Sequence, residues 1–194
     1  NMAIEKYLEH LPKINPKSYI ADSAVIMGMV ELDEGTSVWP NATMRGDVNY
    51  IKMGKFSNVQ DNAVVHVAAQ PCPTIIGDHV TIGHGAIVHA CIIEDNCLIG
   101  MGAVVLDGAI IGRGSIVGAG AVVAPGKIIP PYSKVMGIPG KVVATMTEDD
   151  EQERIKHARR YWNLAAQYIE GGEAYMLDEP EIPIETDEPY QKYL

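Results

Sequence analysis

The sequence predicts an all-β fold, a parallel β-helix of hexapeptide repeats, with one C-terminal α-helix packed on its flank. Three observations lead to this prediction. Aliphatic residues return at every sixth position along most of the chain, glycines crowd the positions between them, and after Val143 the apolar residues are instead spaced by three and four. A period of six fits neither a helical stripe nor a simple hairpin meander, and it is typical of a β-helix whose repeats each form a strand and a turn.

The repeat is clearest from Ile93 to Val135, where every sixth residue is Ile or Val and the residue four further on is usually small. We call these sixth-position aliphatic residues the leads. The same register appears upstream at Ile20, Ile26, Leu32 and Val38, at Met53, Val59 and Val65, and at Ile76, Ile82 and Val88. This pattern resembles the left-handed parallel β-helix of the hexapeptide-repeat proteins. The resemblance implies three hexapeptides in each triangular coil, with the leads stacked inside.

The hexapeptide register is interrupted in three places. Residues 50–52 are inserted before Met53, residues 71–75 are inserted before Ile76, and one residue is missing between Val88 and Ile93. The second insertion falls in the run QPCPT, whose two prolines predict a loop protruding from a corner of the coil.

We predict three segments along the chain: a β-helix domain over residues 3–145, a helix over 147–170 and an acidic tail over 171–194. Thr147 and the three acidic residues after it are typical of a helix start. An apolar stripe then follows on one helix face, formed by Ile155, Ala158, Trp162, Ala165 and Ile169. The stripe predicts that this helix packs against the flank of the β-helix. The acidic, proline-bearing tail is left without assigned structure.

Composition limits the function classes and the partners. The net charge of −10 argues against nucleic acid or an anionic membrane as a partner. The three cysteines do not suggest a disulfide framework, and no apolar run is long enough to span a bilayer. We therefore expect a cytoplasmic protein.

Two histidines occupy equivalent positions in neighbouring coils. His66 and His89 directly follow the leads Val65 and Val88, so both should point outward, about 4.8 Å apart, as a chelating pair. His84 lies on another face, near a corner, and could reach such a pair only on a neighbouring chain. Three chains around a threefold axis would repeat this contact and close into a homotrimer. Three neutral imidazoles with one open position are the arrangement that turns bound water into hydroxide near neutral pH.

The three histidines, with the run SNVQDN (57–62) and RGD (45–47), resemble the γ-class carbonic anhydrases over roughly residues 3–170. The resemblance implies a metal-dependent enzyme that hydrates CO2 reversibly to bicarbonate by a metal-bound hydroxide at a trimer interface. It implies that His66 and His89 of one chain and His84 of the next bind the metal. Zn²⁺ is expected, one per chain, and Fe²⁺ or Co²⁺ would also suit three imidazoles.

The same resemblance assigns four polar residues to the surroundings of the metal. Arg45 and Asp47 match an interfacial pair that helps to hold the trimer, and a plain salt bridge between subunits and a catalytic role are equal interpretations of this pair. Asn58 and Asp61 match polar residues behind the ligands, and could instead satisfy turn backbone.

Three further residues match catalytic positions of the family. Gln60 follows a lead and should point outward, where it would orient the nucleophile or the substrate. Tyr161 and Asn163 match a Tyr-x-Asn pair on the C-terminal helix that reaches the site, or else they form ordinary helix surface.

Two departures from the family pattern predict slow hydration. The residue after RGD is Val48, and the inserted loop at 71–75 contains no acid, so the glutamate-bearing loop that shuttles protons in the best-known members is missing.

A second hypothesis is an acyl-CoA-dependent acyltransferase, since VMGIPGKVV (135–143) resembles the last coil of those enzymes. Its candidate CoA-phosphate contacts are Lys127, Lys134 and Lys141. A non-catalytic metal-binding homologue and a purely structural subunit of a larger assembly are also compatible with the sequence.

Overall fold

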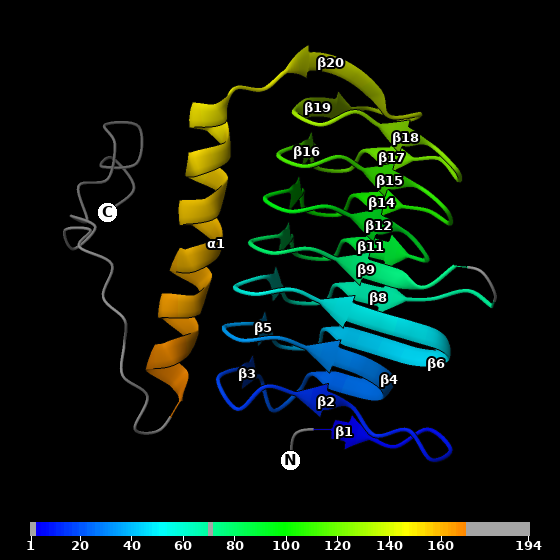
Figure 1. Ribbon diagram of the computed structural model, residues 1–194, viewed down its shortest axis with the longest axis vertical. Coiled ribbons are helices and arrows are strands. Elements are labelled where there is room, and N and C mark those ends of the chain that lie inside the picture. The colour runs from blue at the N-terminus through cyan, green and yellow to red at the C-terminus, as the bar shows by residue number, and fades with distance from the viewer. Residues whose placement is uncertain (1–2, 70–71, 170–194) are drawn as a thin grey trace, which may run out of the picture.

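The computed structural model describes residues 3–69 and 72–169, which form a β-helix with one long α-helix running along its side (Figure 1). The predicted fold class is confirmed. The predicted acidic tail, residues 171–194, lies outside the described residues.

Most of the strands are two or three residues long, as expected for a chain that turns after every hexapeptide. The strands are β1 (Ala3–Glu5), β2 (Lys13–Ile14), β3 (Tyr19–Ile20), β4 (Val25–Leu32), β5 (Ser37–Val38), β6 (Thr43–Met53), β7 (Asn58–Val59), β8 (Val64–His66), β9 (Thr74–Ile76), β10 (Thr81–Ile82), β11 (Ile87–His89), β12 (Ile92–Ile93), β13 (Leu98–Ile99), β14 (Val104–Val105), β15 (Ile110–Ile111), β16 (Ile116–Val117), β17 (Val122–Val123), β18 (Ile128–Ile129), β19 (Ser133–Met136) and β20 (Lys141–Thr145). The helix is α1 (Glu148–Tyr168).

The strands stack in parallel, one coil above another. One row runs β3-β5-β7-β10-β13-β16-β19, and β6 joins two further rows, β8-β11-β14-β17 and β9-β12-β15-β18. Every lead aligns with the lead one coil away, as in the pairs Val65 with Val88 and Ile93 with Ile111. The leads are buried almost completely and fill the interior. Burial of one such side chain contributes about 1.5–3 kcal/mol, so the aliphatic stack is the main source of stability.

Short turns connect the three rows, and several depend on a residue with positive φ. Gly108 has a φ of +70°, and Ala90 holds the corresponding place one coil below with a φ of +49°. The Gly108 N–H donates to the Ala90 carbonyl over 2.7 Å, which ties the two turns together. Glycine adopts this conformation without the steric cost that a side chain brings.

The interruptions of the register take different forms. The insertion at 50–52 becomes part of β6, which crosses a corner without breaking and pairs with β4, β8 and β9. The loop predicted within 71–75 ends earlier than expected, because Thr74 and Ile75 already belong to β9. The Thr74 hydroxyl donates to the His66 carbonyl over 2.5 Å, and this bond closes the base of the loop. The last strand, β20, is antiparallel to β19 and not another hexapeptide coil.

α1 begins at the predicted N-cap. Thr147 accepts a hydrogen bond from the Asp150 N–H, and the Asp150 carboxylate accepts in return from the Thr147 N–H, which forms a capping box. The helix ends at Tyr168. Three members of the predicted stripe, Ala158, Trp162 and Ala165, are buried, and the helix packs on β3, β5 and β7. No helix among the described residues is both long enough and apolar enough to cross a membrane.

A buried carboxylate fixes the start of α1 to the coils beneath it. The side chain of Glu151 is 5% exposed and accepts hydrogen bonds from Asn96 and Arg113, each over 2.7 Å, and from Tyr132 over 3.2 Å. Burial alone would raise the pKa of Glu151, but the bonds from Arg113 and Asn96 hold it below the ordinary value. The ionised carboxylate therefore stabilises the docked helix.

We expect Glu151→Gln to lower the free energy of unfolding at pH 7 by about 1–3 kcal/mol, because buried donors lose a charged acceptor. The lowered pKa gives stability that is complete above the unfolded value of about 4.3 and is lost as the pH falls through the folded value. The difference between the two proteins should therefore shrink in acid. Denaturant unfolding at several pH values measures it, with the exposed Glu153→Gln on the same helix as the control. A constant difference at all pH values would contradict the assignment.

Candidate metal centre

Two imidazoles meet on the outer surface of the β-helix. The strand register of β8 and β11 places His89 opposite His66, one coil apart. His66 Nδ1 lies 3.1 Å from His89 Nε2, and the two ring planes are tilted by 57°. Each histidine follows a fully buried lead, Val65 or Val88, and the alternation of side chains along a strand turns it outward. The pair therefore stands where the repeat register predicts.

A carboxylate bonds the far side of each ring. His66 Nε2 lies 3.0 Å from Asp47 Oδ1, and His89 Nδ1 lies 2.5 Å from Asp107 Oδ1. The four side chains, which we call the axial column, come from successive coils in the order Asp47, His66, His89, Asp107. The column runs along the axis of the β-helix, with an acid at each end and the imidazole pair in the middle.

The column leaves two lone pairs aimed at each other. An ionised carboxylate only accepts hydrogen bonds, so the ring nitrogen that faces each acid carries a proton. In neutral rings His66 Nδ1 and His89 Nε2 are then both unprotonated, 3.1 Å apart. A cation between them makes this arrangement favourable, whether it is a proton in an N–H···N hydrogen bond or a metal ion. Zinc–nitrogen bonds of about 2.0–2.1 Å in tetrahedral geometry place two ligand nitrogens about 3.3 Å apart, so the pair fits a transition metal with little movement.

Asp47 is held as an anion by several donors. Burial would raise its pKa, but the Val48 N–H, which donates to Oδ1 over 2.7 Å, the His66 ring and the nearby Arg45 together lower it. Arg45 makes a close ion pair with Asp47 Oδ2. The Arg45 side chain is 45% exposed, so it can also meet a neighbouring molecule. The predicted Arg45–Asp47 pair thus forms within one chain and also anchors His66.

His84 lies at a corner of the coil with its own carboxylate. His84 Nδ1 is 3.0 Å from Asp61 Oδ2, and both side chains are about 40% exposed, 42% for the histidine and 38% for the acid. Burial and, less strongly, the charge of Asp61 raise the pKa of Tyr161 on α1. Within the part of one chain that the structure describes, no group of three His, Cys, Asp or Glu side chains is placed to hold a metal.

The remaining predicted site residues are less exposed than the sequence suggests. Gln60 is 3% exposed and donates to Asn58 Oδ1 over 3.1 Å, while Asn58 donates to Thr81 Oγ1 over 3.0 Å. Both lie on the row that α1 covers, which is why outward-pointing side chains are buried there. Asn163 is partly exposed on α1, and the described residues offer its side chain no hydrogen bond.

Buried thiols are not available as ligands. Burial raises the pKa of Cys91 and of Cys97 to about 12, so both remain protonated thiols near neutral pH. The donors that face the outer surface are imidazole nitrogens backed by carboxylates, a set that suits zinc, iron(II) or cobalt(II).

Asp107 is a site residue that the sequence analysis missed. Its residue type does not distinguish it, because an aspartate in a turn is usually a backbone cap. The signal lies in the spacing, because Asp107 follows His89 by 18 residues, the length of one coil. A search for acids one coil away from each histidine would have found it.

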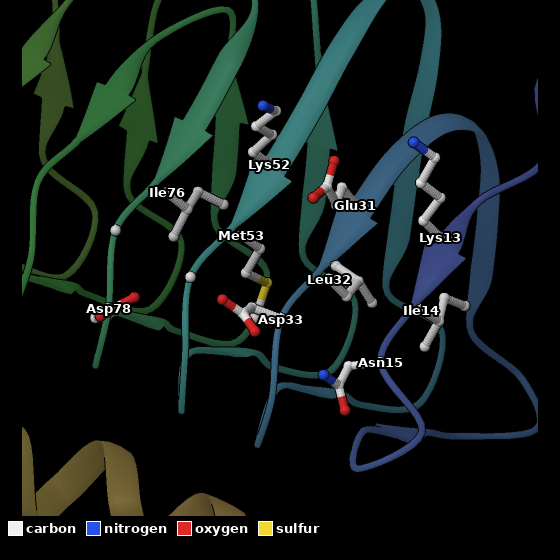
Figure 2. Close-up of a pocket in the computed structure, with 12 residues that line it drawn as sticks. Lys13, Ile14, Asn15, Glu31, Leu32, Asp33, Lys52, Met53, Ile76 and Asp78 are labelled. Atoms are coloured by element: carbon white, nitrogen blue, oxygen red, sulfur yellow. The ribbon is translucent and has the colours of Figure 1, made fainter.

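A wide depression elsewhere on the β-helix has a different character (Figure 2). It measures about 570 Å³ and lies over the first coils. Lys13, Glu31 and Lys52 stand in a row on β2, β4 and β6, with Asp33 and Asp78 near the following turns. Its lining mixes charges of both signs and includes no imidazole, so we do not assign the metal centre to it.

Comparisons with known proteins agree with this fold. The family model described as bacterial transferase hexapeptide (six repeats) matches residues 90–125. Among solved structures, a putative acetyltransferase from Bacillus cereus is 40% identical, with a TM-score of 0.83 over 87% of this chain and 97% of that one. The chain is therefore a hexapeptide-repeat protein.

Two curated relatives define the family more closely. A probable carbonic anhydrase from Methanocaldococcus jannaschii is 56% identical over 146 residues, which cover 75% of this chain and 91% of the relative. The mitochondrial gamma carbonic anhydrase 2 of Arabidopsis thaliana is 38% identical over 79% of this chain, which spans 57% of that relative. The chain belongs to the γ-class carbonic anhydrase family.

We expect the full-length protein, purified anaerobically and without chelators, to contain close to one equivalent of a transition metal per chain. His66→Ala should lose most of this metal, because it removes half of the imidazole pair. Elemental analysis measures it. His10→Ala is the matched control, since His10 is 43% exposed at the opposite end of the chain from α1 and far in sequence from the column. Full metal content in His66→Ala would contradict the assignment of His66 as a metal ligand.

Proposed function

We propose that this chain assembles into a homotrimer that catalyses the reversible hydration of CO2 to bicarbonate at metal centres between subunits. The observation that carries the proposal is the imidazole pair, with two ring nitrogens facing each other at 3.1 Å and a carboxylate behind each ring. In this proposal His66 and His89 of one subunit and His84 of the next bind one Zn²⁺, with Fe²⁺ or Co²⁺ as the alternatives.

The surface around the pair supports assembly with further copies of the chain. Val64 and Ile87 lie on the same face as the histidines and are 39% and 40% exposed. They align with Val104 and Val122 in the next coils, so an apolar row runs beside the axial column. A second copy that covers this row would bury apolar surface and bring a corner histidine to the pair. Such heterologous contacts close into a ring after three copies if each rotation is one third of a turn.

When bound, a divalent transition metal supplies the acidification of water that makes a nucleophile near neutral pH. The chain's own residues would hold the metal-binding rings in place and orient the reacting water. The Asp47, Asp107 and Asp61 carboxylates fix the three rings. The Gln60 side-chain N–H donates to Asn58 Oδ1. The Gln60 side-chain oxygen accepts no hydrogen bond from the described residues, so this oxygen can accept one from the reacting water. Tyr161 would line the same corner from α1.

This chain offers few groups that could accept the proton released in the reaction. Val48 is 51% exposed beside the column, where an acid could have accepted a proton from the site. The loop between His66 and Thr74 brings no acid either. A proton must therefore pass directly to solvent or to a buffer molecule, which limits turnover.

The acyltransferase alternative draws on the name of the B. cereus relative, a putative acetyltransferase. The lysines that could meet CoA phosphates on the last strands, Lys134 and Lys141, are exposed. An acyltransferase uses one histidine as a base and has no need of a second imidazole aimed at the first. The axial column therefore favours the hydratase. The cytoplasmic location remains a prediction.

We expect metal-replete protein to hydrate CO2 slowly, and the rate to rise with the concentration of an imidazole buffer, because an external base replaces the missing shuttle. Stopped-flow measurement with a pH indicator tests this, with the chelated protein as the control. No hydration at any buffer concentration, together with tight CoA binding, would favour the transferase.

Mixed trimers test the sharing of ligands between chains. His84→Ala and His89→Ala should each be inactive when pure, since every centre then has two histidines. After subunit exchange, a centre is complete where a His84→Ala chain supplies the pair and its neighbour, a His89→Ala chain, supplies His84. Random mixing gives about a quarter of such interfaces, so metal binding and activity should return to about that fraction. No recovery despite proven exchange would mean that the three histidines act within one chain.

A further inference from the structure

We propose that Asp107 is a positioning residue of the metal centre, which fixes the His89 ring so that its Nε2 lone pair faces the metal. The inference rests on the proposed function and adds to it a residue from a coil that carries no metal-binding histidine. His89 is the residue through which Asp107 would act, and Asp107 itself would touch neither metal nor substrate.

The contact is short and directional. Asp107 Oδ1 lies 2.5 Å from His89 Nδ1, while His89 Nε2, on the other side of the ring, faces His66. A carboxylate at Nδ1 selects the tautomer that carries its proton there and leaves Nε2 free to bind a metal. It also stops the ring from turning about its bond to Cβ, which would move Nε2 away from the pair.

The turn beneath Asp107 is shortened in a way that makes room for this contact. Leu106 follows its lead as His89 follows Val88, and Gly108 matches Ala90, so His89's coil has no residue at the position of Asp107. The residue missing from the register between Val88 and Ile93 is the one that would lie directly below Asp107. Its absence leaves the carboxylate to reach the imidazole of the coil below.

Two aspartates in other turns of this β-helix, Asp78 and Asp95, cap backbone amides with their carboxylates, and among the described residues Asp107 does not. Asp78 Oδ1 accepts from the Lys55 N–H over 2.7 Å, and Asp95 Oδ1 accepts from the Asp78 N–H over 2.8 Å. The turn at Asp107 is closed by backbone alone, through the bond from the Ala109 N–H to the Leu106 carbonyl over 3.0 Å. The Asp107 carboxylate is 45% exposed and has the His89 ring as its hydrogen-bond partner among the described residues. A role in holding the turn therefore does not explain it.

Asp22 provides a matched control. It stands two residues after the lead Ile20, as Asp107 stands two after Val105, and its turn is closed by the same backbone bond, from the Ala24 N–H to the Ala21 carbonyl over 2.9 Å. Asp22 is exposed and lies on a different face from His66 and His89, in the stack of turns that carries Asp61 two coils further on. Asp22→Ala therefore makes the same chemical change in an equivalent turn without touching the column.

The experiment compares metal affinity in full-length trimers of the wild type, Asp107→Ala, Asp107→Asn and Asp22→Ala. Chelator competition with Zn²⁺ and with Co²⁺ gives the affinity, and the visible spectrum of bound Co²⁺ reports the geometry of the ligands. We expect Asp107→Ala to weaken binding by about 10–100-fold, as loss of a carboxylate behind a metal-binding histidine does, and to change the Co²⁺ spectrum. Asp107→Asn should lose less metal affinity than Asp107→Ala, since the amide oxygen of Asn can still accept a hydrogen bond from His89 Nδ1. Asp22→Ala should match the wild type.

A double variant separates orientation from general charge. At metal concentrations high enough to load the two remaining histidines, Asp107→Ala in a His89→Ala background should weaken metal binding no further than His89→Ala alone, because the acid acts through the ring. Equal affinity and spectrum in Asp107→Ala and the wild type would overturn the inference, as would an additive loss in the double variant. If the wild type itself binds no metal, the proposed function fails first. If it binds metal and hydrates CO2 but Asp107→Ala does not differ, only this inference fails.

Discussion

The in-register stacking of one coil on the next is the constraint on which the rest of this structure depends. Parallel strands about 4.8 Å apart place each side chain over its counterpart one coil away. Inside, this builds an unbroken column of Val and Ile leads such as Val65, Val88 and Val105. On the outer surface, the same stacking makes polar residues that follow successive leads into neighbours, so residues one coil apart in the sequence contact each other. One stacking register therefore determines both the buried core and the surface site.

The irregular turns lie where that register meets the site. The insertion at 50–52 lies within β6, where that strand passes from one row to the next. The loop before Thr74 and the missing residue after His89 follow β8 and β11 at the same corner of the next two coils. The regular turn that follows them in the next coil carries Asp107. A strict hexapeptide turn at every level would stack identical turns, whereas the residue missing after His89 leaves Asp107 to reach the imidazole of the coil below.

The sequence predicted those features that depend on period alone. The leads, the helix start at Thr147 and the pairing of His66 with His89 follow from counting, and the structure places them accordingly. It did not predict the burial of Gln60, because that depends on where α1 lies across the coils. The 18-residue spacing of His89 and Asp107 makes the acid a candidate neighbour, but the sequence does not give the direction in which its carboxylate points. In the proposed trimer, the position of His84 relative to the pair depends on a second chain, which no single-chain register contains.

The axial column also links metal binding to assembly. With a carboxylate fixing each ring, His66 Nδ1 and His89 Nε2 face each other at 3.1 Å, and a cation between them removes the repulsion of their lone pairs. In the proposed trimer the remaining ligand, His84, comes from the next subunit, so a metal bound to all three joins two chains. A ligand that binds only the assembled state stabilises that state by mass action. The carboxylates that orient the imidazoles thereby favour the subunit arrangement in which the three rings converge, and the apolar row beside them is buried by the same step.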